Sequence, residues 1–79
     1  MSPTVFRYKN YRFFFFSREE IRKHIHIQST NGECKYWLEP EISLAHNQYL
    51  TDVQLNEIKS LIKEKYNDII NAWNKHFSS

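Results

Sequence analysis

The chain has 79 residues, a net charge of +2 and 13 aromatic residues, made up of six Phe, five Tyr and two Trp. A chain of this length holds one domain, residues 1–79, and buries only about 60% of the surface that it exposes when unfolded. Large rings must therefore supply much of the core. The single cysteine, Cys34, excludes an intramolecular disulfide and a cysteine-based zinc cluster.

The sequence shows no segment for a membrane or for export. The longest apolar run, Phe13 to Phe16, is far shorter than a membrane span. The first residues lack a basic stretch followed by an apolar region, so we expect no signal peptide and place the protein in the cytoplasm. We find no glycine-rich phosphate loop, nucleophile elbow or dinucleotide fingerprint, and we expect no cofactor.

The two halves of the chain differ in charge. Residues 1–38 carry seven Lys or Arg and three Asp or Glu, whereas residues 39–79 carry four and six. The half that is expected to form strands is the basic half, which weakly favours an anionic partner there.

The first predicted hairpin joins Thr4 to Tyr8 with Tyr11 to Phe16, two stretches rich in β-branched and aromatic residues. They flank Lys9-Asn10, and a two-residue turn there requires positive φ at Lys9. The expected cross-strand pairs are Tyr8 with Tyr11, Arg7 with Arg12, Phe6 with Phe13, and Val5 with Phe14.

The second predicted hairpin joins His24 to Ser29 with Cys34 to Glu39 around Asn31-Gly32, a strong hairpin signal. A two-residue turn on that pair places Ser29 opposite Cys34 and His24 opposite Glu39. Alternation then separates two faces. The apolar face carries Ile25, Ile27, Cys34, Tyr36 and Leu38. The mixed face carries His24, His26, Gln28, Lys35, Trp37 and Glu39.

A fifth strand and a helix are expected after Pro40. Glu41 to Ala45 is a candidate edge strand with Ile42 and Leu44 pointing inward. Thr51 and Gln54 then form a capping box. A continuous apolar stripe follows, formed by Leu55, Ile58, Ile62, Tyr66, Ile69, Trp73 and Phe77.

The stripe favours a single helix from about Asp52 to about His76, although Asn67-Asp68 could instead cap a second helix after a kink near Tyr66. The predicted fold is therefore α+β, a small antiparallel sheet of two β-hairpins packed on one long C-terminal amphipathic helix.

One helix covers only one face of such a sheet, so aromatic surface should remain on the other. Phe14, Phe16 and Trp37 are the candidate interface residues, for a partner protein or a second copy of the chain. The alternative is that the segment 17–23, which carries Arg18, or the N-terminus folds over them.

His24 and His26 are two residues apart on a strand and project from the same face. Such a pair can act as acid and base at a phosphate, with Arg22 joining the site and Glu39 orienting the first ring. His46 and His76 cannot be placed nearby from sequence, so a third metal ligand is missing and we expect no metal site. The alternative is a pair of surface histidines that pack beside Trp37.

Arg7 and Arg12 repel each other across the first hairpin, which an anion or solvent screening would relieve. If the two hairpins lie side by side, these arginines share a surface with Lys35 and Trp37. Basic groups among aromatic rings suit single-stranded nucleic acid, and a solvated basic surface is the alternative.

Several segments resemble the small bacterial family catalogued as domain of unknown function 4160. They are Thr4 to Tyr8, Phe13 to Ser17, His24-Ile25-His26-Ile27, Gly32 to Pro40, Leu44-Ala45-His46-Asn47 and Ala72-Trp73. The chain departs from many relatives at Arg22-Lys23, where they carry Pro-Pro, and at Tyr49, where they carry glycine. The resemblance implies a short α+β protein that is often encoded beside another small protein in a toxin–antitoxin-like pair. It thereby implies a protein partner and a toxin role on RNA.

Three functions follow as hypotheses. The first is a protein-interaction component of a toxin–antitoxin-like two-gene system, bound to a small partner encoded nearby or to itself. The second is a metal-independent RNase, or another phosphate-directed enzyme, that uses His24, His26, Arg22 and Glu39. The third is a non-catalytic nucleic-acid-binding module.

Overall fold

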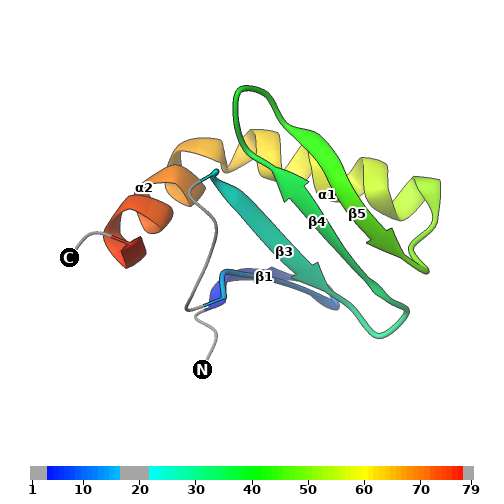
Figure 1. The fold of residues 1–79 in the computed structure, drawn as a ribbon. Helices are drawn as coiled ribbons and strands as arrows, with labels where there is room; N and C mark the ends of the chain where they lie inside the picture. Colours follow the sequence, from blue (N-terminus) through cyan, green and yellow to red (C-terminus); the bar gives the residue numbers. More distant parts are fainter. Residues whose placement is uncertain (1–3, 17–21, 78–79) are drawn as a thin grey trace.

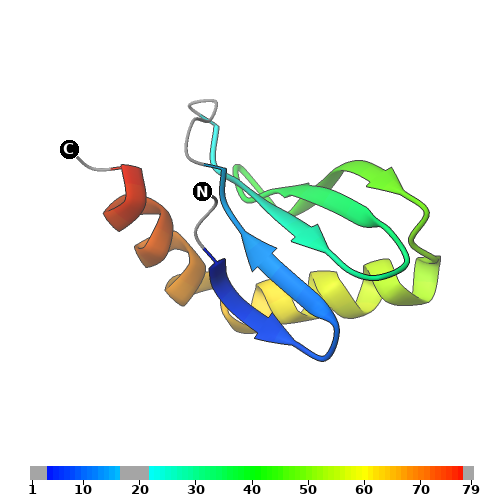
Figure 2. The same cartoon turned by 90° about the horizontal axis from the view of Figure 1, so that it is seen from below.

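A computed structural model describes residues 4–16 and 22–77 of the chain. The elements in chain order are β1 (Thr4–Tyr8), β2 (Tyr11–Phe14), β3 (His24–Gln28), β4 (Glu33–Trp37), β5 (Ser43–Gln48), α1 (Asp52–Glu64) and α2 (Tyr66–Phe77). The strands form one antiparallel sheet in the order β1-β2-β3-β4-β5. Both helices lie on the same side of the sheet (Figures 1 and 2), which confirms the α+β class.

The first hairpin has the predicted turn and most of the predicted register. Lys9 has a φ of 53°, as a two-residue turn requires. Arg7 pairs with Arg12 and Phe6 with Phe13, but Phe14 pairs with Thr4 because a bulge interrupts β1. The predicted pairing of Val5 with Phe14 is therefore wrong, and Val5 packs against the core.

The second hairpin keeps the predicted faces but not the predicted register. His24 pairs with Trp37 and Gln28 with Glu33, so residues 29–32 form a four-residue loop. That loop is closed by a hydrogen bond from Ser29 N–H to the carbonyl oxygen of Gly32 (2.9 Å). The register differs from the expected one by two residues, and because side chains alternate with a period of two, both faces survive the shift.

Gly32 is needed for space and not for the positive φ that an Asn-Gly turn requires. Its φ is not positive, so the chain does not need glycine there for backbone conformation. A Cβ at this position would instead collide with the carbonyl oxygen of Gln48 and come within 3.1 Å of the Tyr49 Cβ. Glycine therefore lets the end of β5 cross close to the hairpin loop.

The fifth strand runs from Ser43 to Gln48, later than the predicted Glu41 to Ala45. A bulge interrupts its pairing with β4, between the Lys35–His46 and Tyr36–Leu44 pairs. Leu44 pairs with the buried Tyr36, so it lies on the predicted inward face, although it stays 45% exposed, and Ile42 packs against the core. Because β5 is the last strand of the sheet, Leu44 has a neighbouring strand on one side only.

Thr51 caps α1 with the predicted capping box to Gln54. The single long helix is a wrong prediction, because helix geometry is interrupted at Lys65 (φ −104°, ψ 21°) and α2 begins at Tyr66. The break lies next to Tyr66, near which the sequence analysis placed a kink as the alternative. The apolar residues of both helices still face the same way. Buried residues of the two helices are Leu55, Ile58, Leu61, Ile62, Ile69 and Trp73.

The core lies between the helices and one face of the sheet. Its completely buried side chains include Phe13, Phe15, Ile25, Ile27, Leu38, Ile58, Ile62 and Ile69. Two tyrosines tie the layers together, because Tyr36 donates to the Leu55 carbonyl (2.9 Å) and Tyr66 donates to the Leu38 carbonyl (2.8 Å). Among the described residues, no helix is long and apolar enough to cross a membrane.

Candidate binding face

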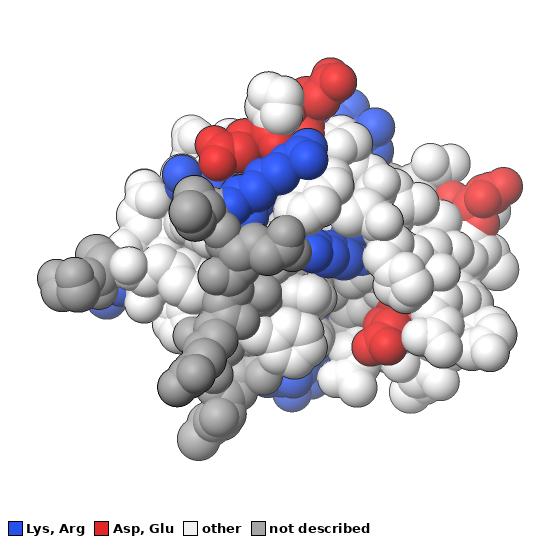
Figure 3. All heavy atoms as spheres, in the orientation of Figure 1, with Lys and Arg blue, Asp and Glu red and all other residues white. Residues whose placement is uncertain are grey.

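The face of the sheet opposite the helices, here called the open face, is crossed by rows of side chains from successive strands. The register aligns Phe14 with His26, His26 with Lys35, and Lys35 with His46, one residue from each of four strands. Figure 3 shows Lys and Arg side chains across the middle of this face, with Asp and Glu toward its top and right. The open face is therefore basic at its centre.

The half-buried Trp37 lies between two cations on this face. The guanidinium carbon of Arg22 lies 4.1 Å from the centroid of the Trp37 ring, and Nζ of Lys35 lies 4.3 Å from it. Both distances fit cation–π contacts, each contributing about 0.5–1 kcal/mol at an exposed site. We call Arg22, Lys35 and Trp37 the Trp37 cluster.

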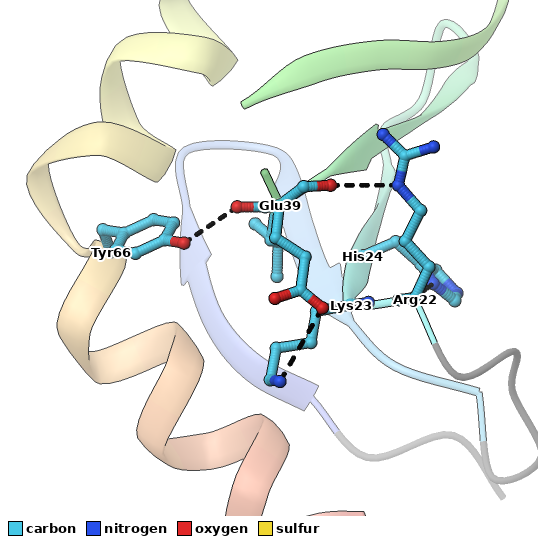
Figure 4. Close-up of polar contacts among 6 residues, drawn as sticks. Arg22, Lys23, His24, Glu39 and Tyr66 are labelled. Atoms are coloured by element: carbon cyan, nitrogen blue, oxygen red, sulfur yellow. Dashed lines mark hydrogen bonds and ion pairs between the residues drawn. The ribbon is translucent and has the colours of Figure 1, made fainter. Parts of the chain in front are cut away.

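The Arg22 guanidinium is held in place by a second contact, to the strand end after β4. Its Nε donates to the carbonyl oxygen of Glu39 (2.9 Å), as Figure 4 shows. This bond fixes a residue that precedes β3 against one that follows β4. The Trp37 cluster is thus preorganised by backbone as well as by ring contacts.

A second group of rings lies at the other side of the open face. The Arg12 guanidinium carbon lies 4.4 Å from the centroid of Phe14, which stacks on His26 at 5.6 Å. Phe16 contacts His26 edge-on at 4.3 Å. Phe14 is buried by these neighbours, whereas Phe16 is 44% exposed. Of these two candidate interface residues, Phe16 is therefore the one that a partner could contact.

The two histidines of β3 have different environments. His24 and His26 project to the same side, with ring centroids 5.1 Å apart, as the sequence predicted. His24, however, is fully buried against Trp37 and Trp73, and its Nδ1 hydrogen-bonds the Arg22 carbonyl (2.7 Å). A side chain with no exposed surface cannot contact a substrate, so this conformation does not offer His24 as a catalytic acid or base.

The predicted pairing of Glu39 with His24 is wrong. Trp37, and not Glu39, is the residue opposite His24. The Glu39 carboxylate lies 3.8 Å from Nζ of Lys23 and accepts from the Lys23 N–H at 3.5 Å (Figure 4). Arg22 and Glu39 therefore act together as structural contacts at the start of β3.

The remaining histidines lie apart from each other. His46 is on the open face opposite Lys35, whereas His76 is on α2 and stacks near Phe15 at 6.1 Å. Within residues 4–16 and 22–77, no cluster of three or more His, Cys, Asp and Glu side chains could hold a metal ion. Cys34 is buried in the core, and burial raises the pKa of its thiol to about 12.

The structure adds a hollow that the sequence did not predict. It has a volume of about 370 Å³, and its lining includes Phe16, His26, Lys35 and His46. His46 comes to this face only because of the bulge in β5, which strict alternation from Ile42 and Leu44 does not reveal. The sequence analysis expected the segment 17–23 or the N-terminus to fold over the aromatic surface. Residues 17–21, which include Arg18, and residues 1–3 lie outside the described residues.

A family model with the description "Domain of unknown function (DUF4160)" matches residues 10–74 of the chain. No curated protein and no solved structure matches the chain significantly. The matched residues include β2 to β5, α1 and most of α2.

Proposed function

The chain belongs to the family described as Domain of unknown function (DUF4160), and from this premise we propose that it is a binding module whose open face docks a small acidic partner protein. The resemblance drawn from the sequence suggests which partner, namely the protein encoded beside it in a toxin–antitoxin-like pair. The proposal concerns binding and assigns no reaction to this chain.

The observation that carries the proposal is the Trp37 cluster. Tryptophan and arginine are among the residue types that dominate binding energy at protein interfaces, and Lys35 adds a second cation beside the ring. The exposed Phe16 ring lies on the same face, across His26, and adds apolar surface.

Charge supports an acidic partner. The open face carries the cations Arg12, Arg22 and Lys35. Glu33, which pairs with Gln28, contributes a negative charge to the same face. A partner with carboxylates around an apolar centre would match both the cations and the rings. Such complementarity speeds association and selects the partner.

The burial of His24 favours binding over hydrolysis of a phosphate ester. A metal-independent RNase built on His24, His26, Arg22 and Glu39 requires both imidazoles at the substrate. His24 is inaccessible, and the Glu39 carboxylate is engaged by Lys23. His26 alone lacks the second group that such chemistry needs.

The proposal is tested by co-expressing the chain with the product of the neighbouring gene and measuring complex formation by size-exclusion chromatography with light scattering. Trp37→Ala and Lys35→Glu should each weaken the complex by at least about tenfold in Kd. The matched control is Lys63→Glu, an equal charge reversal on exposed α1 surface, which should leave affinity unchanged.

Far-ultraviolet circular dichroism of each variant separates a lost contact from a lost fold. The proposal fails if no complex forms, or if the two open-face variants bind as tightly as the control. If the isolated chain forms a dimer that both variants abolish, the open face binds a second copy of the chain, and this result would also overturn the proposal.

A further inference from the structure

A groove of about 470 Å³ lies between the tips of the two hairpins, away from the Trp37 cluster. The first hairpin contributes Thr4, Arg7, Asn10 and Arg12, and the second contributes Gln28, Ser29 and Thr30. The lining therefore consists of two guanidinium groups with hydroxyl and amide groups around them. Among the residues that the structure describes, the groove has no acidic lining residue.

The two arginines are directly opposite each other in the β1–β2 ladder. Opposite residues of an antiparallel pair have Cβ atoms about 4.5–5.5 Å apart, and like charges there are destabilising. The register is nevertheless held on the other side of the sheet, where Phe6 stacks on Phe13 with centroids 4.1 Å apart. The fold thus concentrates two positive charges on one wall of the groove.

The groove is held in shape by contacts around it. Nε of Arg12 donates to the Thr4 hydroxyl (2.7 Å), which orients the guanidinium along β1. The Asn10 amide donates to the Thr30 hydroxyl (3.0 Å) and joins the two hairpin tips. A site whose walls are already in place loses less free energy in ordering when it binds.

These features select one ligand chemistry. Guanidinium groups bind phosphate oxygens through charge-assisted and often bidentate hydrogen bonds. The Ser29 hydroxyl and the second N–H of the Asn10 amide can donate to further oxygens of the same group. The volume is within the range of about 300–1,000 Å³ for small-molecule sites and exceeds the needs of a single phosphate.

We infer that this groove binds a phosphate group, held between Arg7 and Arg12, as free phosphate or as the phosphate of a nucleotide. The inference goes beyond the proposed function, because none of the Trp37 cluster residues lines the groove and Arg12 alone is shared with the cations of the open face named above. A bound dianion would also neutralise the repulsion between the two arginines.

The test is isothermal titration calorimetry of the full chain with inorganic phosphate and with a ribonucleoside 5′-monophosphate, with sodium chloride keeping ionic strength constant. Arg7→Gln should weaken binding of both by about tenfold or more, since one charge-assisted contact is lost. Arg7 is exposed, so this variant should fold normally. The matched control, Lys63→Gln, removes an exposed cation on α1 outside the groove and should bind as the unchanged chain does.

Tighter binding of the nucleotide would identify the nucleotide as the source of the phosphate, and equal binding would identify free phosphate. Thermal unfolding gives an independent readout, in which phosphate should raise Tm more than chloride at equal ionic strength. Equal effects of phosphate and chloride would overturn the inference. So would an equal loss of binding in Arg7→Gln and Lys63→Gln, since binding would then depend on overall charge.

Discussion

The hydroxyl of Tyr36, on β4, donates a hydrogen bond to the backbone carbonyl of Leu55, on α1, across 2.9 Å of buried interior. The bond joins the sheet to the first half of the helix that covers it. Both residues are buried, so water does not compete for either atom. Burial also raises the pKa of Tyr36 to about 12, which keeps the donor protonated.

Tyr36→Phe should lower the free energy of unfolding by about 1 kcal/mol, because the carbonyl stays buried without this donor. Urea unfolding followed by tryptophan fluorescence measures the change. Tyr8→Phe is the control, since Tyr8 is 39% exposed and its hydroxyl can bond water. Equal stability of Tyr36→Phe and the unchanged chain would show that the bond contributes nothing.

Alkaline pH should destabilise the fold. Burial raises the pKa of the Cys34 thiol from 9.0 to about 12 and that of Tyr36 from 10.0 to about 12. Above about pH 9 the unfolded chain therefore loses protons that the folded chain keeps, so the free energy of unfolding falls as pH rises. Urea unfolding at neutral pH and at about pH 10.5 checks this, and Tyr36→Phe should flatten the decline. A free energy of unfolding that is unchanged over this range would contradict the assignment.

The Cys34 thiol should be unreactive in the folded protein. It is 3% exposed and remains protonated at neutral pH, whereas thiol reagents require an accessible thiolate. Labelling with iodoacetamide should proceed only as fast as the chain unfolds, and urea should accelerate it. Rapid labelling of the native protein would show that Cys34 is accessible after all.

Gly32→Ala should be destabilising by about 1–3 kcal/mol, the usual cost of inserting a methyl group into filled space. The new Cβ would meet the backbone of Gln48, which cannot rotate away as a flexible side chain can. Asn31→Ala, in the same loop but exposed, should cost less. Chemical denaturation compares the two, and a harmless Gly32→Ala would show that β5 moves aside easily.

Asn47→Ala should cost about 1–2 kcal/mol, because two hydrogen bonds are lost together. The Asn47 amide donates to the Leu50 carbonyl (3.0 Å) and accepts from the Leu50 N–H (3.1 Å), which fixes the connection from β5 to α1. Asn47→Asp retains only the acceptor and should also destabilise the fold. Gln48→Ala is the exposed control. A Tm for Asn47→Ala equal to that of Gln48→Ala would refute the role.

Local chemistry explains which parts of the fold the sequence predicted. The Lys9-Asn10 turn, the capping box at Thr51 and the alternation of Ile25 and Ile27 depend on neighbouring residues, and all three are confirmed. The loop around Gly32 was predicted with the wrong length. Glycine is required there because a Cβ would collide with the backbone of Gln48, a residue of another strand, and a turn rule considers only neighbouring residues.

The candidate site divides in the same way. Alternation correctly placed Lys35 and Trp37 on one face with His26. It did not reveal that Trp73 of α2 would reach His24 and help to bury it. Nor could it place His46, whose position depends on a bulge. Long-range packing and irregular pairing are the two effects that sequence periodicity does not contain.

The neighbour-to-neighbour strand order bears on how the protein is made. Each strand pairs with the one synthesised just before it, so only short loops must close while the sheet assembles. Translation thus supplies all five strands before the ribosome reaches Trp73, whose ring packs on Phe15 and His24. Until α2 has been made, Phe15 and His24 therefore lack the ring that packs on them in the folded protein.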